Sequence, residues 1–142
     1  MLRRALLLAP FSLLLLPRRA SAHSYKLGAI EIGHPWARPS VTGKAAVFLA
    51  LANTGYDTDR LTGGSTPIAH EVFLRDTDGS TLEELTLSPH RPVALRPGGR
   101  YIALLGLANP LALDDTFPLT LRFAGAGEIT VTVRVEDAPE ED

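Results

Sequence analysis

The sequence of 142 residues contains no cysteine. Without a thiol the chain has no disulfide, no thiolate metal site and no cysteine nucleophile, so its fold must be stabilised by its own hydrophobic core. The single methionine is Met1, so a chain that has lost its start contains no sulfur ligand of any kind. A basic surplus is also missing, since 14 basic residues face 16 acidic ones. This balance excludes the positive patch that nucleic acid or an anionic membrane would call for.

The sequence also lacks the motifs of common enzymes. There is no G-x-S-x-G nucleophile elbow, no phosphate-binding loop and no dinucleotide fingerprint. The paired acids Glu83-Glu84 and Asp114-Asp115 fall in predicted turns, where solvated carboxylates are more common than acid–base catalysts. We therefore expect a protein that is not an enzyme.

The first 22 residues have the pattern of a secretory signal peptide. A basic start at Arg3-Arg4 is followed by an apolar run over residues 5–16 and by the small-residue site Ala20-Ser21-Ala22. The apolar run is too short to span a bilayer, so no membrane span is expected after processing. We predict a signal peptide over residues 1–22, a mature chain that begins at His23, and a periplasmic location.

The C-terminal end is strongly acidic. Residues 1–22 hold four of the 14 basic residues and none of the 16 acids, so the remaining chain has a formal charge of −6. Five of its acids lie in the last seven residues. We predict a folded domain over residues 23–135 and an acidic disordered tail over residues 136–142.

Between these ends the chain reads as short strands separated by turns. Alternation is clearest over Phe117–Phe123 and over Glu128–Val135. Other predicted strands cover Tyr25–Ile32, Ala45–Ala52, Glu71–Asp76, Pro92–Arg96 and Arg100–Leu105, a less regular one covers Thr81–Leu87, and turns are predicted at Thr62–Ser65, Asp78-Gly79 and Pro97–Gly99. No longer helical period appears after residue 22, so the pattern predicts an all-β sandwich or barrel.

Several motifs resemble those of one family in both order and spacing. They are His34-Pro35-Trp36-Ala37-Arg38, Ala45 to Gly55, Asp59-Arg60-Leu61, Leu95-Arg96-Pro97-Gly98-Gly99, Leu105-Gly106-Leu107, Asn109-Pro110-Leu111, Leu119 to Phe123 and Gly127-Glu128-Ile129. Together they resemble the PCuAC family (DUF461) of periplasmic copper chaperones over residues 25–135. The resemblance implies a single-domain, cupredoxin-like or Ig-like Greek-key β-sandwich. It also implies Cu(I) transfer toward respiratory oxidase, with a periplasmic copper or oxidase-assembly protein as partner.

The ligand positions of that family are substituted in this chain. The resemblance implies a His, a Met on the next hairpin, and a His-x-Met pair on the strand after the Pro-Gly-Gly turn. Here the first position falls on Arg75 and the pair falls on Tyr101 and Ala103, while the shortened hairpin offers no residue for the Met. A guanidinium has no lone pair to donate, a neutral phenol is a poor Cu(I) ligand, and alanine is none. We predict a copper chaperone-like protein that has lost the family's site.

Two other roles remain open at this point. His23 with its own α-amine, together with His34, would form a weak Cu(II) site, against the simpler reading of a frayed terminus. Alternatively, Arg75, Arg96, Arg100 and Tyr101 form a recognition surface for a partner protein or a small anion. The simpler reading is that Arg75 pairs with Asp76 or Glu83. His70 and His90 are expected at the surface.

Overall fold

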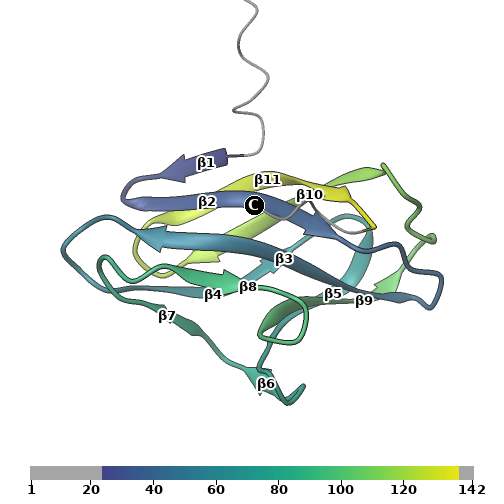
Figure 1. Cartoon of the computed structure of the whole chain (residues 1–142), viewed down its shortest axis with the longest axis horizontal. Coiled ribbons are helices and arrows are strands. Elements are labelled where there is room, and N and C mark those ends of the chain that lie inside the picture. Colours follow the sequence, from purple (N-terminus) through teal and green to yellow (C-terminus); the bar gives the residue numbers. More distant parts are fainter. Residues whose placement is uncertain (1–23, 138–142) are drawn as a thin grey trace, which may run out of the picture.

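The computed structural model describes residues 24–137, and this part of the chain contains β-strands and no helix (Figure 1). Its strands are β1 (Ser24–Leu27), β2 (Ile30–Ala37), β3 (Lys44–Asn53), β4 (Asp59–Ser65), β5 (Ala69–Arg75), β6 (Thr81–Leu82), β7 (Leu85–Leu87), β8 (Val93–Leu95), β9 (Tyr101–Leu107), β10 (Thr116–Phe123) and β11 (Gly127–Val135). The prediction of an all-β fold is confirmed. The predicted signal peptide, His23 and residues 138–142 of the predicted tail lie outside the described residues.

Nothing in the described range is a helix long and apolar enough to cross a membrane.

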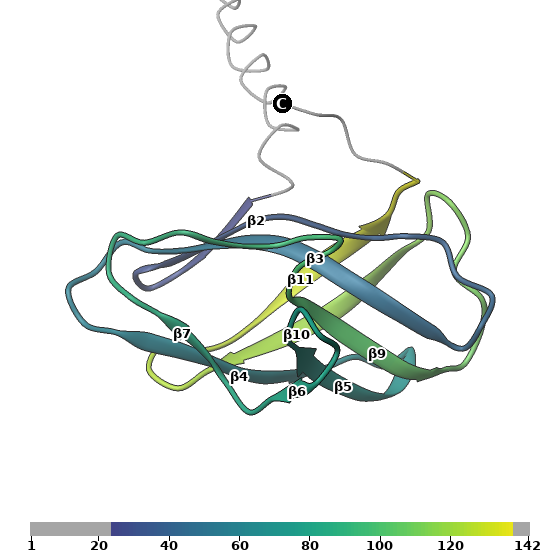
Figure 2. The same ribbon diagram turned by 60° about the horizontal axis from the view of Figure 1, so that its bottom comes forward.

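The strands form one sheet that curls into two layers. Hydrogen bonds join them in the order β6-β5-β9-β3-β2-β11-β10-β4-β7, with β1 added to β2 and β8 added to β3. The first and last strands of this order, β6 and β7, are separated in sequence only by Glu83 and Glu84. Figure 2 shows β2 and β3 in one layer and β4 and β10 in the other. Only β11 and β2 pair in parallel among the named strands.

The core lies between the two layers. Strands β10 and β11 show how it forms, because alternate residues point inward and meet across the strand pair. Phe117 faces Val133 and Leu119 faces Val131, and all four side chains are buried. The strands predicted from alternation over Phe117–Phe123 and Glu128–Val135 are therefore confirmed.

The N-terminal segment differs from the single strand predicted over Tyr25–Ile32. Gly28 has a φ of 58° and turns the chain, so β1 folds back on β2 with Leu27 opposite Ile30. Glycine adopts this left-handed conformation without a steric penalty. The loose alternation on both sides of the glycine hid the turn.

The segment Thr62–Ser65 is also not a turn, because it lies within β4. Gly64 faces β10 so closely that a Cβ atom on it would come 2.5 Å from the carbonyl oxygen of Thr120. The pairing of β4 with β10 shifts register between Arg122 and Phe123, which marks a β-bulge. Glycine is therefore required here by the approach of another backbone, and not by a reversal of the chain.

The Pro-Gly-Gly turn separates two strands that pair, one after the other, with the same side of β3. Strands β8 and β9 both pair with β3, with Leu95 opposite Leu49 and Ile102 opposite Val47. Residues 96–101 therefore lie opposite Phe48 alone, and we call them the 96–101 excursion. The amide of Gly99 donates to the carbonyl of Arg96 at 2.9 Å, which confirms the tight turn.

Phe48 in turn packs on Trp36, its register partner on β2. The two ring centroids are 4.8 Å apart, and both residues are buried. Trp36 is therefore a buried aromatic anchor between β2 and β3. Its neighbour Ala37 belongs to the core cluster between the layers, whereas Trp36 and Phe48 pack outside it.

Candidate functional site

Strands β5 and β9 bring three of the predicted positions onto one face of the sheet. Arg75 lies directly opposite Tyr101, and Phe73 lies opposite Ala103. Because side chains alternate along a strand, Tyr101 and Ala103 project on the face away from Ile102 and Leu104, which belong to the core. The two strands lie side by side in Figures 1 and 2.

An open cavity of about 550 Å³ covers this face, and we call it the β5–β9 cavity. It is lined by Lys44, Ala45, Ala46, Arg75, Gly79, Tyr101, Ala103 and Leu105. Strand β3 contributes the side that sequence reasoning missed: Ala46 pairs with Ala103, and Lys44 pairs with Leu105. Lys44 directly precedes the predicted strand Ala45–Ala52, but only the register of β3 on β9 places it at the cavity.

Neutral groups hold the Arg75 guanidinium. Its Nη1 donates to the Thr81 hydroxyl at 2.8 Å and to the Gly79 carbonyl at 3.4 Å. Its Cζ lies 5.4 Å from the centroid of the Phe73 ring, which is a cation–π distance. Thr81 belongs to β6, so the short β5–β6 hairpin positions this side chain.

The simpler reading, in which Arg75 pairs with Asp76 or Glu83, is wrong for the described residues. Within residues 24–137, Arg75 makes no ion pair. The Asp76 carboxylate lies 3.5 Å from the Nε of Arg100 instead. Arg75 therefore presents a positive charge that no carboxylate of this part of the chain neutralises.

The turn of the hairpin is braced by Asp78. Its carboxylate accepts hydrogen bonds from the Ser80 amide at 2.9 Å and from the Ser80 hydroxyl at 2.7 Å. The hydroxyl bond, followed by the amide bond, lowers the pKa of Asp78 below its ordinary value. Gly79 has a φ of 88°, which fits the predicted Asp-Gly turn. The brace holds the Gly79 carbonyl near Arg75.

The other two predicted arginines do not line the cavity. Arg96 and Arg100 belong to the 96–101 excursion, where the Arg96 amide donates to the Arg100 carbonyl at 3.1 Å. Both side chains are exposed. The structure thus brings together Arg75 and Tyr101 from the predicted surface, adds Lys44, and leaves Arg96 and Arg100 outside.

The described histidines also lie elsewhere. His34 has a φ of 47° and places its Nε2 3.2 Å from a carboxylate oxygen of Glu136, so the first residue of the predicted tail contacts β2. His70 lies beside Gly106, and the exposed His90 ring is 6.4 Å from that of Tyr56. Within residues 24–137 there is no group of three or more His, Asp or Glu that would hold a metal ion.

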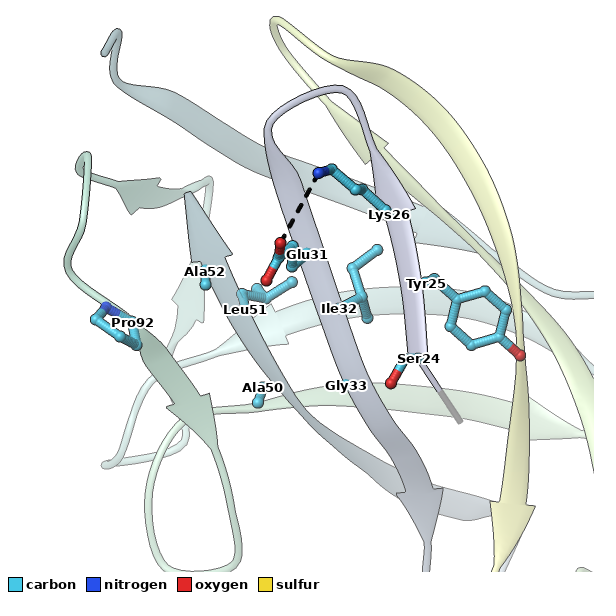
Figure 3. Close-up of a pocket in the computed structure, with 10 residues that line it drawn as sticks. All are labelled: Ser24, Tyr25, Lys26, Glu31, Ile32, Gly33, Ala50, Leu51, Ala52 and Pro92. Carbon is cyan, nitrogen blue, oxygen red and sulfur yellow. Dashed lines mark ion pairs between the residues drawn. The ribbon is translucent and has the colours of Figure 1, made fainter. Parts of the chain in front are cut away.

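A second hollow lies on the outer face of β1, β2 and β3 (Figure 3). Small residues, including Gly33, Ala50 and Ala52, form its floor. The one ion pair across it joins Lys26 and Glu31 at 4.0 Å. Its lining has no cluster of metal ligands or nucleophiles, so these residues do not form a metal-binding or catalytic site.

The donors of the β5–β9 cavity suit an anion better than a soft metal ion. An ammonium and a guanidinium only donate hydrogen bonds, and a neutral phenol is a weak ligand. Cu(I) prefers thioether, thiolate and imidazole ligands, and the lining contains none of these. No aspartate or glutamate lines the cavity either.

Comparison with known proteins finds similarity to a family and to a protein whose descriptions both name a lipoprotein. A family model described as "Putative lipoprotein LpqE-like" matches residues 30–135. A protein of Leifsonia xyli subsp. xyli named "Putative lipoprotein Lxx21020" is 28% identical over 130 residues, which cover 86% of this chain and 78% of that protein.

Solved structures give the same fold. The copper-bound PCuAC domain from PmoF2 superposes with a TM-score of 0.75 at 29% identity, covering 82% of this chain and 99% of that one. The apo PCuAC domain from PmoF1 also gives 0.75, at 28% identity, covering 82% of this chain and all of that one. The Cu(I) form of DR1885 from Deinococcus radiodurans gives 0.65 at 23% identity, covering 87% of each chain, which supports the fold alone.

Proposed function

Since this chain belongs to the LpqE-like family and shares the fold of copper-binding PCuAC domains, we propose that it is a copper chaperone-like binding module that no longer holds Cu(I) itself. Its β5–β9 cavity, in the place of the family's ligands, recognises an anionic group. The positive, carboxylate-free lining of that cavity supports this proposal most directly.

The first support is the position of the substituted residues. Arg75, Tyr101 and Ala103 are the residues onto which the family's His and His-x-Met positions fall in sequence. All three line one cavity, which is what a shared ligand site on neighbouring strands requires. A site that has kept its place in the fold and changed its donors agrees with a changed ligand.

The second support is the chemistry of the replacements. The Arg75 guanidinium offers no lone pair to a metal ion, and its charge repels a cation placed within a few ångströms. Ala103 contributes only a methyl group. A Cu(I) ion at this position would have no soft donor and one cationic neighbour.

The location and the partner of this protein are proposed from its relatives. Their names describe lipoproteins and copper-bound domains, which favours an extracytoplasmic location. A periplasmic copper-binding or oxidase-assembly protein is then the natural partner. None of the relatives' names describes an enzyme, which supports a binding role.

The proposal is tested by competition for Cu(I). We compare the protein with the triple variant Arg75→His, Tyr101→His, Ala103→Met against a chromogenic Cu(I) chelator under reducing conditions. The unmodified protein is expected to leave the chelator loaded. The variant should bind at least about 100-fold more tightly, equivalent to about 2.7 kcal/mol.

The matched control is the variant Arg91→His, Arg122→His, Ala108→Met, which adds the same three side chains at exposed positions on three separate segments outside the cavity. It should not gain affinity for Cu(I), because its new donors are not on one cavity lining. Thermal unfolding of each variant checks that the fold persists. Cu(I) binding by the unmodified protein as tight as by the triple variant would show that the proposal is wrong.

A further inference from the structure

The charge on Arg75 is fixed in place and left without an acid. Its Nη1 is used by Thr81 and Gly79, while its Nε and Nη2 make no hydrogen bond within residues 24–137. The side chain is half-buried, so this charge is only partly compensated by water. A planar guanidinium with two free N–H groups on one edge is suited to a carboxylate.

A second cation stands at the far end of the same cavity. Lys44 pairs with Leu105, four residues along β9 from Tyr101, so the two cationic residues start about 13 Å apart along the strand. Neither Lys44 nor Arg75 forms an ion pair within the described residues. Both long side chains border the cavity, and their fields add over it.

The floor between the two cations is apolar. Ala46 and Ala103 face each other across β3 and β9, and Leu105 continues the same row. The cavity volume of about 550 Å³ is in the range of small-molecule sites. An inorganic anion would leave this floor unused, whereas an organic acid would cover it and exclude water from the ion pair.

We infer that the β5–β9 cavity is a binding site for an organic carboxylate with an apolar body, with Arg75 as the carboxylate anchor and Lys44 as a second positive group. This inference rests on the proposed function, because it names the class of anion that the altered site recognises. Two sources share this chemistry: a free organic acid, and the carboxylate at the end of an apolar peptide.

The test is calorimetric and NMR titration of the full folded domain at low salt. The probes are 3-phenylpropionate, its uncharged amide 3-phenylpropionamide, and inorganic phosphate. The acid should bind at least about tenfold more tightly than the amide, as expected for a hydrogen bond to a charged group. Its shift perturbations should centre on Tyr101, Ala103 and Ala46, and raised ionic strength should weaken binding.

Variants identify the anchor. Arg75→Gln should weaken binding of 3-phenylpropionate about tenfold or more, and Lys44→Gln should weaken it less. Arg75→Lys keeps the charge but loses the planar guanidinium. Its affinity for 3-phenylpropionate should therefore lie between those of the unmodified protein and Arg75→Gln. Arg96→Gln is the control, because it removes an exposed cation outside the cavity.

A short apolar peptide, tested with a free and with an amidated C-terminus, separates the two sources. Tighter binding of the free peptide than of the small acid identifies a chain end as the ligand, and the reverse order identifies a free acid. Either order supports a carboxylate site.

The inference is overturned if the amide or phosphate binds as well as the acid, if none of the carboxylates binds, or if Arg96→Gln weakens binding as much as Arg75→Gln. It is also overturned if shifts centre on Gly33 and Ala50 instead. The Cu(I) competition is a separate measurement: Cu(I) binding by the unmodified protein as tight as by the triple variant would refute the proposed function, whatever the carboxylate titration shows.

Discussion

Arg75 is held differently from the arginines that pair with acids on the same molecule. Arg60 and Arg134 face carboxylate oxygens at 3.1 and 2.9 Å. Arg75 contacts a hydroxyl, a carbonyl and an aromatic ring, which fix its orientation and leave its charge in place. A fixed, unneutralised guanidinium is an interaction group, whereas Arg60 and Arg134 each form a surface ion pair with a carboxylate.

The hydrogen bond from the Ser80 hydroxyl to the Asp78 carboxylate should control the pKa of Asp78. Ser80→Ala removes the hydroxyl bond, the larger cause of the lowered pKa, so the pKa of Asp78 should rise toward its ordinary value. The folded-state pKa lies below the unfolded one, so the stability that Asp78 contributes is present above about pH 4 and is lost as the pH falls through the folded value.

An NMR titration of the Asp78 carboxyl carbon measures this shift directly. Thr77→Ala, one residue before Asp78, removes a hydroxyl that makes no hydrogen bond with it, and should leave the titration unchanged. An unaltered Asp78 midpoint in Ser80→Ala would contradict the assigned cause.

At the scale of elements, the contact of β4 with β10 depends on the absence of a side chain. Gly64→Ala would place a methyl group 2.5 Å from the Thr120 carbonyl oxygen, so one backbone must move. We expect a loss of about 1–3 kcal/mol in the free energy of unfolding, the usual range for overpacking.

Gly33→Ala is the matched control, since a Cβ there meets nothing within 4 Å and the residue lies in a strand. It should change stability by less than about 0.5 kcal/mol, as is usual for surface positions. Denaturant unfolding of both variants measures the difference. Equal losses would show that close approach is not the reason for glycine at position 64.

The elements show how far sequence patterns reach. Strands β10 and β11 were predictable because one face is buried along β10 and from Val131 to Val135 of β11, which forces alternation. The β1–β2 turn at Gly28 was missed because the alternation on both sides of the glycine is loose. The role of Gly64 in β4 was missed because it depends on a contact with the distant strand β10. The family positions placed Arg75 and Tyr101 near each other, but only the register of β3 on β9 revealed Lys44 at the same cavity.

At the scale of the whole molecule, the two layers are joined beyond their shared core by Tyr25. Its phenol oxygen accepts a hydrogen bond from the Thr132 amide of β11 at 2.9 Å. Figure 3 shows its ring turned away from the hollow on β1, β2 and β3 and toward β11. Tyr25 thus bridges the gap between β1, which is paired with β2 along its length, and β11, which pairs with β2 only at Arg134 and Val135.

Tyr25→Phe should therefore increase hydrogen exchange at the Thr132 amide and reduce stability by about 1 kcal/mol. The ring itself remains, so the change reports the hydrogen bond alone. Tyr56→Phe is the control, because Tyr56 is 93% exposed. If Thr132 exchanges at the same slow rate in Tyr25→Phe, the phenol does not hold the two layers together.

The 96–101 excursion makes this part of the chain tolerant of inserted residues. Both of its flanks are hydrogen-bonded to β3, one through Leu95 and one through Ile102, so the pairing does not depend on the length of chain between them. Each doubling of a flexible loop costs only about 0.6 kcal/mol in closure entropy. Residues 97–99 are thus a place where a foreign peptide can be grafted next to the cavity while the strands on either side keep their partners.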